Sequence, residues 1–83
     1  MENYYLYILY SEKLDRYYTG SSGNPEERLV RHNAGATRST KPGRPWKIVY
    51  REGFESRSDA VKRENYIKRM KSKAYIKGLI DGD

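Results

Sequence analysis

The sequence predicts a small α/β (α+β) domain with elements in the order β-β-α-β-α-α, in which helices flank a small three-stranded antiparallel sheet. Residues 4–10 (YYLYILY) are all aromatic or aliphatic, which is typical of a strand buried on both faces. Residues 24–27 (NPEE) have the residue types that start a helix, with Asn at the N-cap, Pro at the first helical position and Glu at the third. Since 83 residues have room for one modest core, we expect residues 1–83 to form a single domain.

The first two strands are expected to form a hairpin. Residues 11–15 make a polar turn after the first strand, and residues 16–19 (RYYT) favour a second strand that pairs with it. Gly20 is expected to end this second strand, and residues 21–23 (SSG) to form a short loop.

The middle of the chain predicts a helix, a loop and a third strand. The helix should run to about Asn33 and stop at residues 34–35 (AG). Residues 36–45 contain a glycine between two prolines and no apolar pattern, so they predict a basic loop. Residues 46–51 (WKIVYR) predict the third strand, which Gly53 should close.

The C-terminal part predicts two helices. Either Ser56 or Ser58 has the side chain to cap the first of them. Ser72 is expected to separate it from a last short helix over residues 73–80.

Composition excludes several classes of protein. The chain has no cysteine, which excludes disulfides and thiolate zinc sites. No apolar run approaches the roughly 18 residues that a membrane span needs, and the N-terminus lacks the basic start of a signal peptide. These features are compatible with a cytoplasmic location, which we expect.

The charge indicates a polyanionic partner. The net charge is +6, and the stretch between His32 and Arg51 carries no acidic residue. A solvated surface is one explanation, but a long run of one sign is poorly suited to solubility alone. The basic loop and the basic C-terminal helix are therefore candidates to hold a nucleic-acid backbone. The residues selected for this contact are Arg31, Arg38, Lys41, Arg44, Lys68 and Lys71.

Glu64 is the most informative single residue. Helical spacing places its carboxylate on the stripe that carries Ala60, Val61 and Ile67. An unpaired charge at the edge of a core is costly, so the carboxylate needs a partner. One interpretation is a salt bridge to Lys68, one turn later. The other is a metal ligand or a catalytic acid.

Further side chains are suited to phosphodiester chemistry. Tyr7 and Tyr18 can lie side by side in the hairpin, where their hydroxyls can accept a proton or position water, although tyrosines are also common strand residues. Arg28 and His32 are four residues apart on the first helix and point the same way. A guanidinium can grip a phosphate and an imidazole can shuttle a proton, although a surface pair is the more common outcome.

Taken in order, these pieces resemble the GIY-YIG nuclease superfamily, in particular its small stand-alone bacterial members. The resemblance rests on residues 5–7 (YLY) and 18–20 (YTG), ten residues apart, followed by Arg28, His32 and Glu64. It covers roughly residues 4–80. The first triplet departs from the family in having Tyr and Leu where the family has Gly and Ile, and the second has Thr at its middle position.

The resemblance implies a role for each position. Tyr7 would be a general base or position the attacking water beside Tyr18, Arg28 would stabilise the scissile phosphate, and His32 would assist proton transfer. Glu64 would hold one divalent cation, Mg²⁺ or Mn²⁺. Two further positions also receive roles: Gly20 would allow close approach to the substrate, and Ser21 would support the site. The resemblance does not determine which tyrosine accepts the proton.

Two functional hypotheses stand beside the simplest one, an interaction domain whose tyrosines are only core residues and whose charge serves only solubility. The first is a divalent-metal-dependent endonuclease that hydrolyses DNA phosphodiester bonds, with branched or damaged DNA and a role in repair or recombination as possible settings. The second is a nucleic-acid-binding module with little or no catalysis, in which the basic residues bind and Glu64 is not required.

Overall fold

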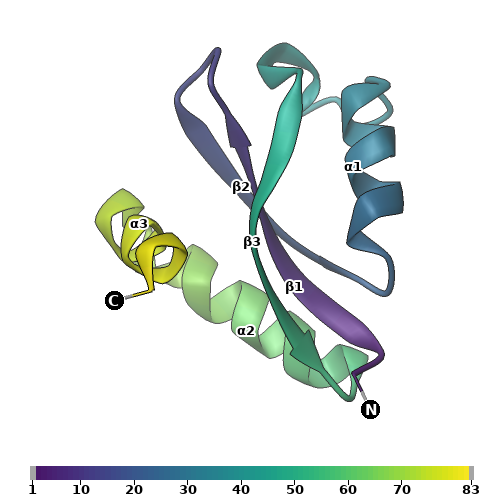
Figure 1. Ribbon diagram of the computed structural model, residues 1–83, viewed down its shortest axis with the longest axis vertical. Coiled ribbons are helices and arrows are strands. Elements are labelled where there is room, and N and C mark those ends of the chain that lie inside the picture. The colour runs from purple at the N-terminus through teal and green to yellow at the C-terminus, as the bar shows by residue number, and fades with distance from the viewer. Residues whose placement is uncertain (1, 83) are drawn as a thin grey trace.

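The computed structural model describes residues 2–82 and has the predicted element order (Figure 1). Its strands are β1 (Tyr4–Ser11), β2 (Arg16–Ser22) and β3 (Trp46–Phe54). Its helices are α1 (Pro25–Asn33), α2 (Arg57–Met70) and α3 (Lys73–Asp81), and the 3-10 turn η1 (Lys41–Gly43) lies in the basic loop.

Strand β1 is the centre of the fold. The three strands form one antiparallel sheet in the order β2-β1-β3. Leu6, Tyr7, Ile8 and Leu9 are each at most 2 % exposed, which confirms the prediction of a strand buried on both faces. Because successive side chains of a strand point to opposite faces, this one strand supplies both cores of the molecule.

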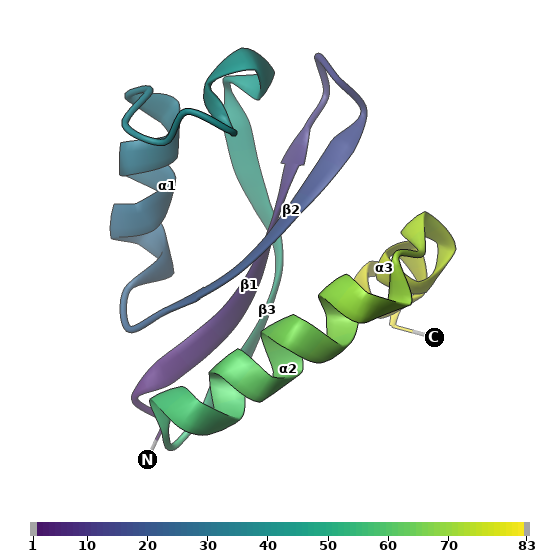
Figure 2. The same ribbon diagram turned by 180° about the vertical axis from the view of Figure 1, so that it is seen from behind.

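Helices cover the two faces of the sheet separately, as the two opposite views in Figures 1 and 2 show. Leu6 and Ile8 pack with Ile67 of α2 and with half-buried side chains of α3. Tyr7 and Leu9 face the other way and form a cluster that includes Leu29 of α1. The α1 face therefore receives the strand tyrosine selected as a candidate site residue.

Strand β2 is longer than predicted. Gly20 does not end it, and residues 21–23 are not all loop, because Ser21 and Ser22 continue the pairing with β1. Gly20 pairs with Tyr7, and a Cβ at Gly20 would lie 2.7 Å from Oη of that tyrosine. Gly20 thus provides the space in which the Tyr7 ring lies, and the sequence-based end of the strand was wrong because this pairing is not local.

Strand β3 also runs further than predicted. Gly53 pairs with Tyr5 and does not close the strand, which continues to Phe54. The register between β1 and β3 shifts after Ile8, which pairs with Tyr50, while Leu9 pairs with Ile48. The unpaired Val49 marks a bulge, and both Val49 and Tyr50 pack towards the α2 and α3 face.

The helix starts agree with the sequence. The Asn24 side chain accepts from the backbone N–H of Glu27, and the Ser72 side chain accepts from that of Tyr75. Of the two serines that the sequence left open for α2, Ser56 is the cap, since its hydroxyl accepts from the backbone N–H of Asp59 at 3.2 Å.

An ion-pair cluster attaches α2 to the sheet and to α3. Arg63 donates to both carboxylate oxygens of Glu52 on β3, each at 3.0 Å, and to the Tyr75 hydroxyl of α3 at 3.1 Å. Tyr50 also donates to Glu52. Burial acts to raise the pKa of Glu52, but these hydrogen bonds outweigh it and the pKa is lowered. The cluster holds α2, and therefore the neighbouring Glu64, against the sheet.

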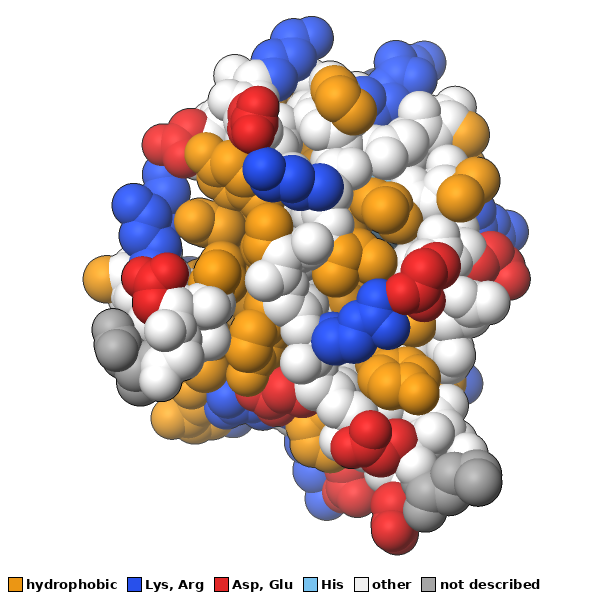
Figure 3. Space-filling model, in the orientation of Figure 1, with side chains coloured by type: hydrophobic (Ala, Val, Ile, Leu, Met, Phe, Trp, Pro, Cys, Tyr) orange, Lys and Arg blue, Asp and Glu red, His pale blue; other side chains and the backbone are white. Residues whose placement is uncertain are grey.

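The view in Figure 3 shows hydrophobic side chains gathered between α3 and β3, with lysines and arginines spread around them. None of the α3 residues is fully buried, although Tyr75, Ile76 and Leu79 pack against the core. Within residues 2–82, no helix has the length and apolar character needed to cross a membrane.

We expect Gly20→Ala to destabilise the protein by about 1–3 kcal/mol, because the added methyl group overlaps the Tyr7 ring and hydroxyl. The matched control is Gly78→Ala in α3, where a Cβ would meet no atom within 4 Å. That change should stabilise the protein by about 0.5–1 kcal/mol, since alanine favours a helix interior. Urea unfolding followed by circular dichroism measures both. Equal effects of the two substitutions would contradict the packing described.

Candidate functional site

The hairpin brings Tyr7 and Tyr18 together against one histidine. Tyr7 pairs with Gly20 and Tyr18 with Leu9, so both rings project from the α1 face of the sheet. The Tyr7 hydroxyl lies 3.4 Å from Nε2 of His32, a long contact for a hydrogen bond. The Tyr18 ring centroid lies 4.9 Å from that of His32. These three candidate residues therefore form one cluster.

His32 is held in place by the basic loop. Its Nδ1 lies 2.8 Å from the hydroxyl of Thr40, and both side chains are almost completely buried. The same hydroxyl donates to the carbonyl oxygen of Thr37 at 3.2 Å. Since that carbonyl can only accept, we assign the single Thr40 proton to it, so that His32 donates through Nδ1–H. The lone pair of Nε2 then faces the Tyr7 hydroxyl.

Burial determines the protonation of this cluster. It raises the pKa of Tyr7 to about 12, with Tyr18 and Glu64 acting in the same direction and Arg28 opposing them. It also lowers the pKa of His32, and the charge of Arg28 lowers it further. At neutral pH the tyrosine therefore keeps its proton and the imidazole is neutral.

Arg28 lies at the exposed edge of the cluster. It precedes His32 by one turn of α1, where the predicted helical spacing places it. Its effects on the pKa values of Tyr7 and His32 show that its charge acts on both groups. An exposed guanidinium beside two buried neutral groups is suited to binding an anion from solvent.

Glu64 approaches from α2 and has two partners. Ser21 donates to its Oε1 at 2.6 Å, and the Lys68 ammonium lies 2.6 Å from its Oε2. Only 17 % of the Glu64 side chain is exposed. The predicted salt bridge to Lys68 is thus present, and it coexists with a location near the tyrosines. The Lys68 ammonium also lies 5.9 Å from the centroid of the Tyr18 ring.

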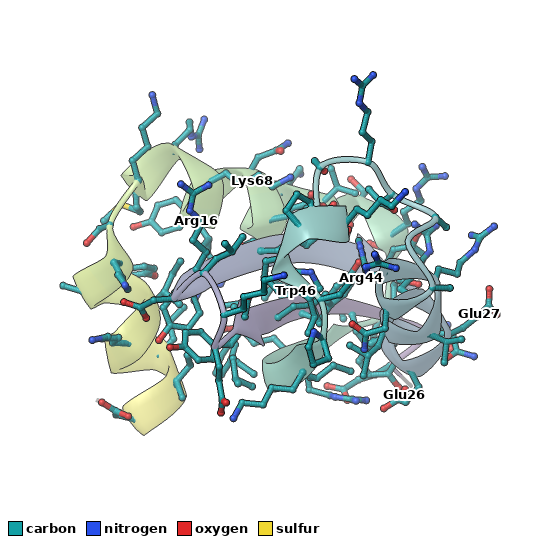
Figure 4. The ribbon with its side chains drawn as sticks, turned by 90° about the horizontal axis from the view of Figure 1, so that it is seen from above. Arg16, Glu26, Glu27, Arg44, Trp46 and Lys68 are labelled. Carbon is teal, nitrogen blue, oxygen red and sulfur yellow. The ribbon has the colours of Figure 1, made fainter. Side chains whose placement is uncertain are left out.

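The basic residues selected from the sequence fall into two groups. Lys68 and Lys71 lie beside the cluster, at the end of α2. The others lie on α1 and the basic loop, and of these Arg31, Arg38 and Lys41 are exposed. Arg44 is half-buried and its Nε donates to the carbonyl oxygen of Lys41 at 2.9 Å, so it also supports the loop (Figure 4).

The candidate site offers few protein ligands for a metal ion. Among the described residues there is no group of three or more His, Cys, Asp or Glu side chains that could hold an ion. Glu64 is the carboxylate that could serve as a metal ligand, and the Ser21 hydroxyl orients its Oε1. Such a single oxygen donor fits Mg²⁺ or Mn²⁺ better than a softer metal, because Mg²⁺ keeps most of its water.

Sequence reasoning missed Thr40. It lies eight residues after His32, in a loop without periodicity, and nothing local distinguishes it from its neighbours. The resemblance implies a supporting role for Ser21, which stays a prediction, and in the structure its hydroxyl donates to Glu64.

We expect His32 to be the neutral Nδ1–H tautomer at pH 7, with a pKa below the ordinary value of 6.5. Nitrogen-15 chemical shifts of the imidazole, followed through a pH titration, measure both properties. Thr40→Val keeps the side-chain shape but removes the acceptor for Nδ1–H, so it should produce a mixture of tautomers. A dominant Nε2–H tautomer in the unsubstituted protein would contradict the hydrogen-bond assignment.

Comparisons with known proteins identify the family of the chain. Residues 3–77 match the family model of the GIY-YIG catalytic domain. The chain is 36 % identical to a UPF0213 protein of Staphylococcus saprophyticus over 99 % of this chain and 100 % of the relative. It is 40 % identical to a UPF0213 protein of Staphylococcus haemolyticus, over 93 % and 94 % of the two chains, and 44 % identical to one of Syntrophus aciditrophicus, over 84 % and 82 %. No solved structure was found to match. With the family model covering nearly the whole chain, the protein belongs to the GIY-YIG nuclease family.

Proposed function

We propose that the protein is a divalent-metal-dependent endonuclease that hydrolyses DNA phosphodiester bonds. The observation that carries the proposal is the meeting of the Tyr7–His32 pair with the Glu64 carboxylate at the β2 edge. Arg28 supplies a cation on the solvent side of the same cluster. Hydrolysis of a phosphodiester needs four functions: a route for the proton of water, a cation that binds the phosphate, an oxygen ligand for a metal ion, and a fixed orientation of these groups.

The proton route proposed runs from water through Tyr7 to His32. With a pKa of about 12, Tyr7 is rarely ionised at neutral pH and is a poor base by itself. Its hydroxyl can accept a proton from the attacking water while it passes its own proton to Nε2 of His32, 3.4 Å away. The imidazolium that forms keeps its Nδ1–H on Thr40. This assignment makes Tyr7 the tyrosine that accepts the proton, and Tyr18 packs beside the imidazole.

Arg28 and Glu64 would manage the charge of the phosphate. The guanidinium of Arg28 is exposed and can donate to phosphate oxygens as negative charge develops. Glu64, oriented by Ser21, would hold one divalent cation, which would supply Lewis-acid chemistry and stabilise the leaving oxygen. In the resting protein Lys68 neutralises the same carboxylate.

Further cations lie beyond the proposed site, on the α1 side. Arg31, Arg38 and Lys41 are exposed on the α1 side and would contact the DNA backbone beyond the site. Branched and damaged DNA, and a role in repair or recombination, belong to the proposal, as does a cytoplasmic location.

We expect Glu64→Gln and Arg28→Ala each to lower the cleavage rate about 100-fold or more, since each removes a charge that acts on the phosphate or its metal. Supercoiled, branched and single-stranded DNA with Mg²⁺ or Mn²⁺ are the substrates to compare. Glu27→Gln is the control, because Glu27 lies on the exposed first turn of α1 and points outward (Figure 4). Cleavage that persists undiminished in Glu64→Gln and Arg28→Ala would overturn the assignment. Metal-independent binding without cleavage would support a binding module instead.

The rate should also depend on pH through His32. Protonated imidazole cannot accept the Tyr7 proton, so the single-turnover rate should fall as the pH is lowered through the His32 pKa, which lies below 6.5. Above that pKa the imidazole is neutral and this group imposes no further change. Tyr7→Phe should lower the rate about 100-fold or more at every pH. A rate that rises as His32 becomes protonated would contradict the proposed route.

A further inference from the structure

A groove lies beside the site, on the outer edge of β2. It has a volume of about 400 Å³ and runs between β2 and the junction of α2 with α3. No strand covers β2 on this side, because the sheet order places β1 on its other side. Figure 2 shows β2 and the α2–α3 pair diverging here. The proposed reaction assigns no ligand to this groove.

The inner walls of the groove are apolar and aromatic. Tyr17 and Ile76 line it on the α2–α3 face and Tyr18 lines it at the β2 edge, and each is half-buried. Ile67 completes the floor and is fully buried. Such walls are suited to a planar, weakly polar group, of which a nucleobase is one.

The rim of the groove is positively charged. Four cations line it: Arg16, Lys68, Lys71 and Lys73. Two of them have carboxylate partners, Lys68 with Glu64 and Lys73 with Asp15. Arg16 and Lys71 are exposed and have no ion-pair partner within residues 2–82. Figure 4 shows the Arg16 and Lys68 side chains extending to the same side of the molecule.

Lys71 also has an unusual backbone. It lies at the C-terminal end of α2 with φ of 47° and ψ of 38°, the left-handed conformation that glycine or asparagine adopts most easily. Glycine would suit this turn better on backbone grounds. Lysine occupies the position instead, and its side chain lies at the rim of the groove.

The groove and the candidate site share two residues. Tyr18 lines the groove and packs against His32, and Lys68 lines the groove and pairs with Glu64. A chain with its phosphate at the site would therefore enter the groove with its adjacent nucleotide. In a duplex that base is paired and stacked, so its face would not reach the apolar walls.

We propose that this groove is a binding subsite for one unpaired nucleotide, the neighbour of the phosphate held at Arg28 and Glu64. Its base packs against Tyr17, Tyr18 and Ile76, and its phosphate is bound by Arg16 and Lys71. The link to a scissile phosphate rests on the proposed function, whereas binding in the groove does not require cleavage. The subsite would direct the enzyme to single-stranded or frayed DNA.

Fluorescence anisotropy in EDTA at low salt tests the subsite with a labelled 12-nucleotide single strand. The variant is Arg16→Gln with Lys71→Gln, and the matched control is Arg57→Gln with Lys62→Gln, two exposed cations of α2 outside the groove. Both pairs remove two charges. We expect the groove variant to weaken binding about tenfold, and to reduce the slope of log affinity against log salt by about 1.4, with a much smaller change in the control.

Two further ligands distinguish binding through contacts with the bases from binding through charge alone. The same strand with abasic sites should bind about tenfold more weakly than the intact strand, and this difference should shrink in Tyr18→Ala. A blunt duplex should show little dependence on Arg16 and Lys71. Equal binding of intact and abasic strands, or equal effects of groove and control variants, would overturn the subsite. The nuclease proposal is tested separately, by the cleavage rates of the Glu64 and Arg28 variants.

Discussion

The contact between the Tyr7 ring and Gly20 is the constraint on which the rest of the site depends. Because Gly20 has no side chain, the ring can lie against β2, and its hydroxyl reaches Nε2 of His32. The same pairing sets the register of the hairpin. It therefore places Tyr18 on the α1 face and Ser21 on the opposite face, where Ser21 donates to Glu64. The missing Cβ at Gly20 thus helps to align groups from four elements, β1, β2, α1 and α2.

The site draws on both faces of a narrow sheet. His32 and Arg28 come from α1 on one face, and Glu64 comes from α2, which packs on the other. They can meet only because β2 is an edge strand, with no further strand between the two helices on that side. The orientation of α2 depends in turn on Arg63, whose bonds to Glu52 hold the helix to β3. A half-buried ion-pair cluster is therefore part of what positions the carboxylate.

The basic loop has a structural task in addition to its charge. Asn33 at the end of α1 exchanges two hydrogen bonds with the backbone of Trp46 at the start of β3, at 2.6 and 3.0 Å. The Trp46 indole donates to the Thr40 carbonyl oxygen at 2.6 Å. These bonds bury Thr40 and place its hydroxyl against Nδ1 of His32, so an irregular segment orients the imidazole.

Local patterns in the sequence were enough to predict the elements and to select the candidate residues of the site. The apolar run of β1, the helix caps and the four-residue spacing of Arg28 and His32 all act within a few residues, so they can be read along the chain. The ends of β2 and β3 could not be predicted in this way, because Gly20 and Gly53 belong to strands only through their pairing with β1. The same holds for Thr40, whose bond to His32 exists only once the loop has closed. Sequence therefore specified which chemical groups are available, and long-range pairing specified where they meet, because hydrogen-bond register and burial depend on residues far apart in the chain.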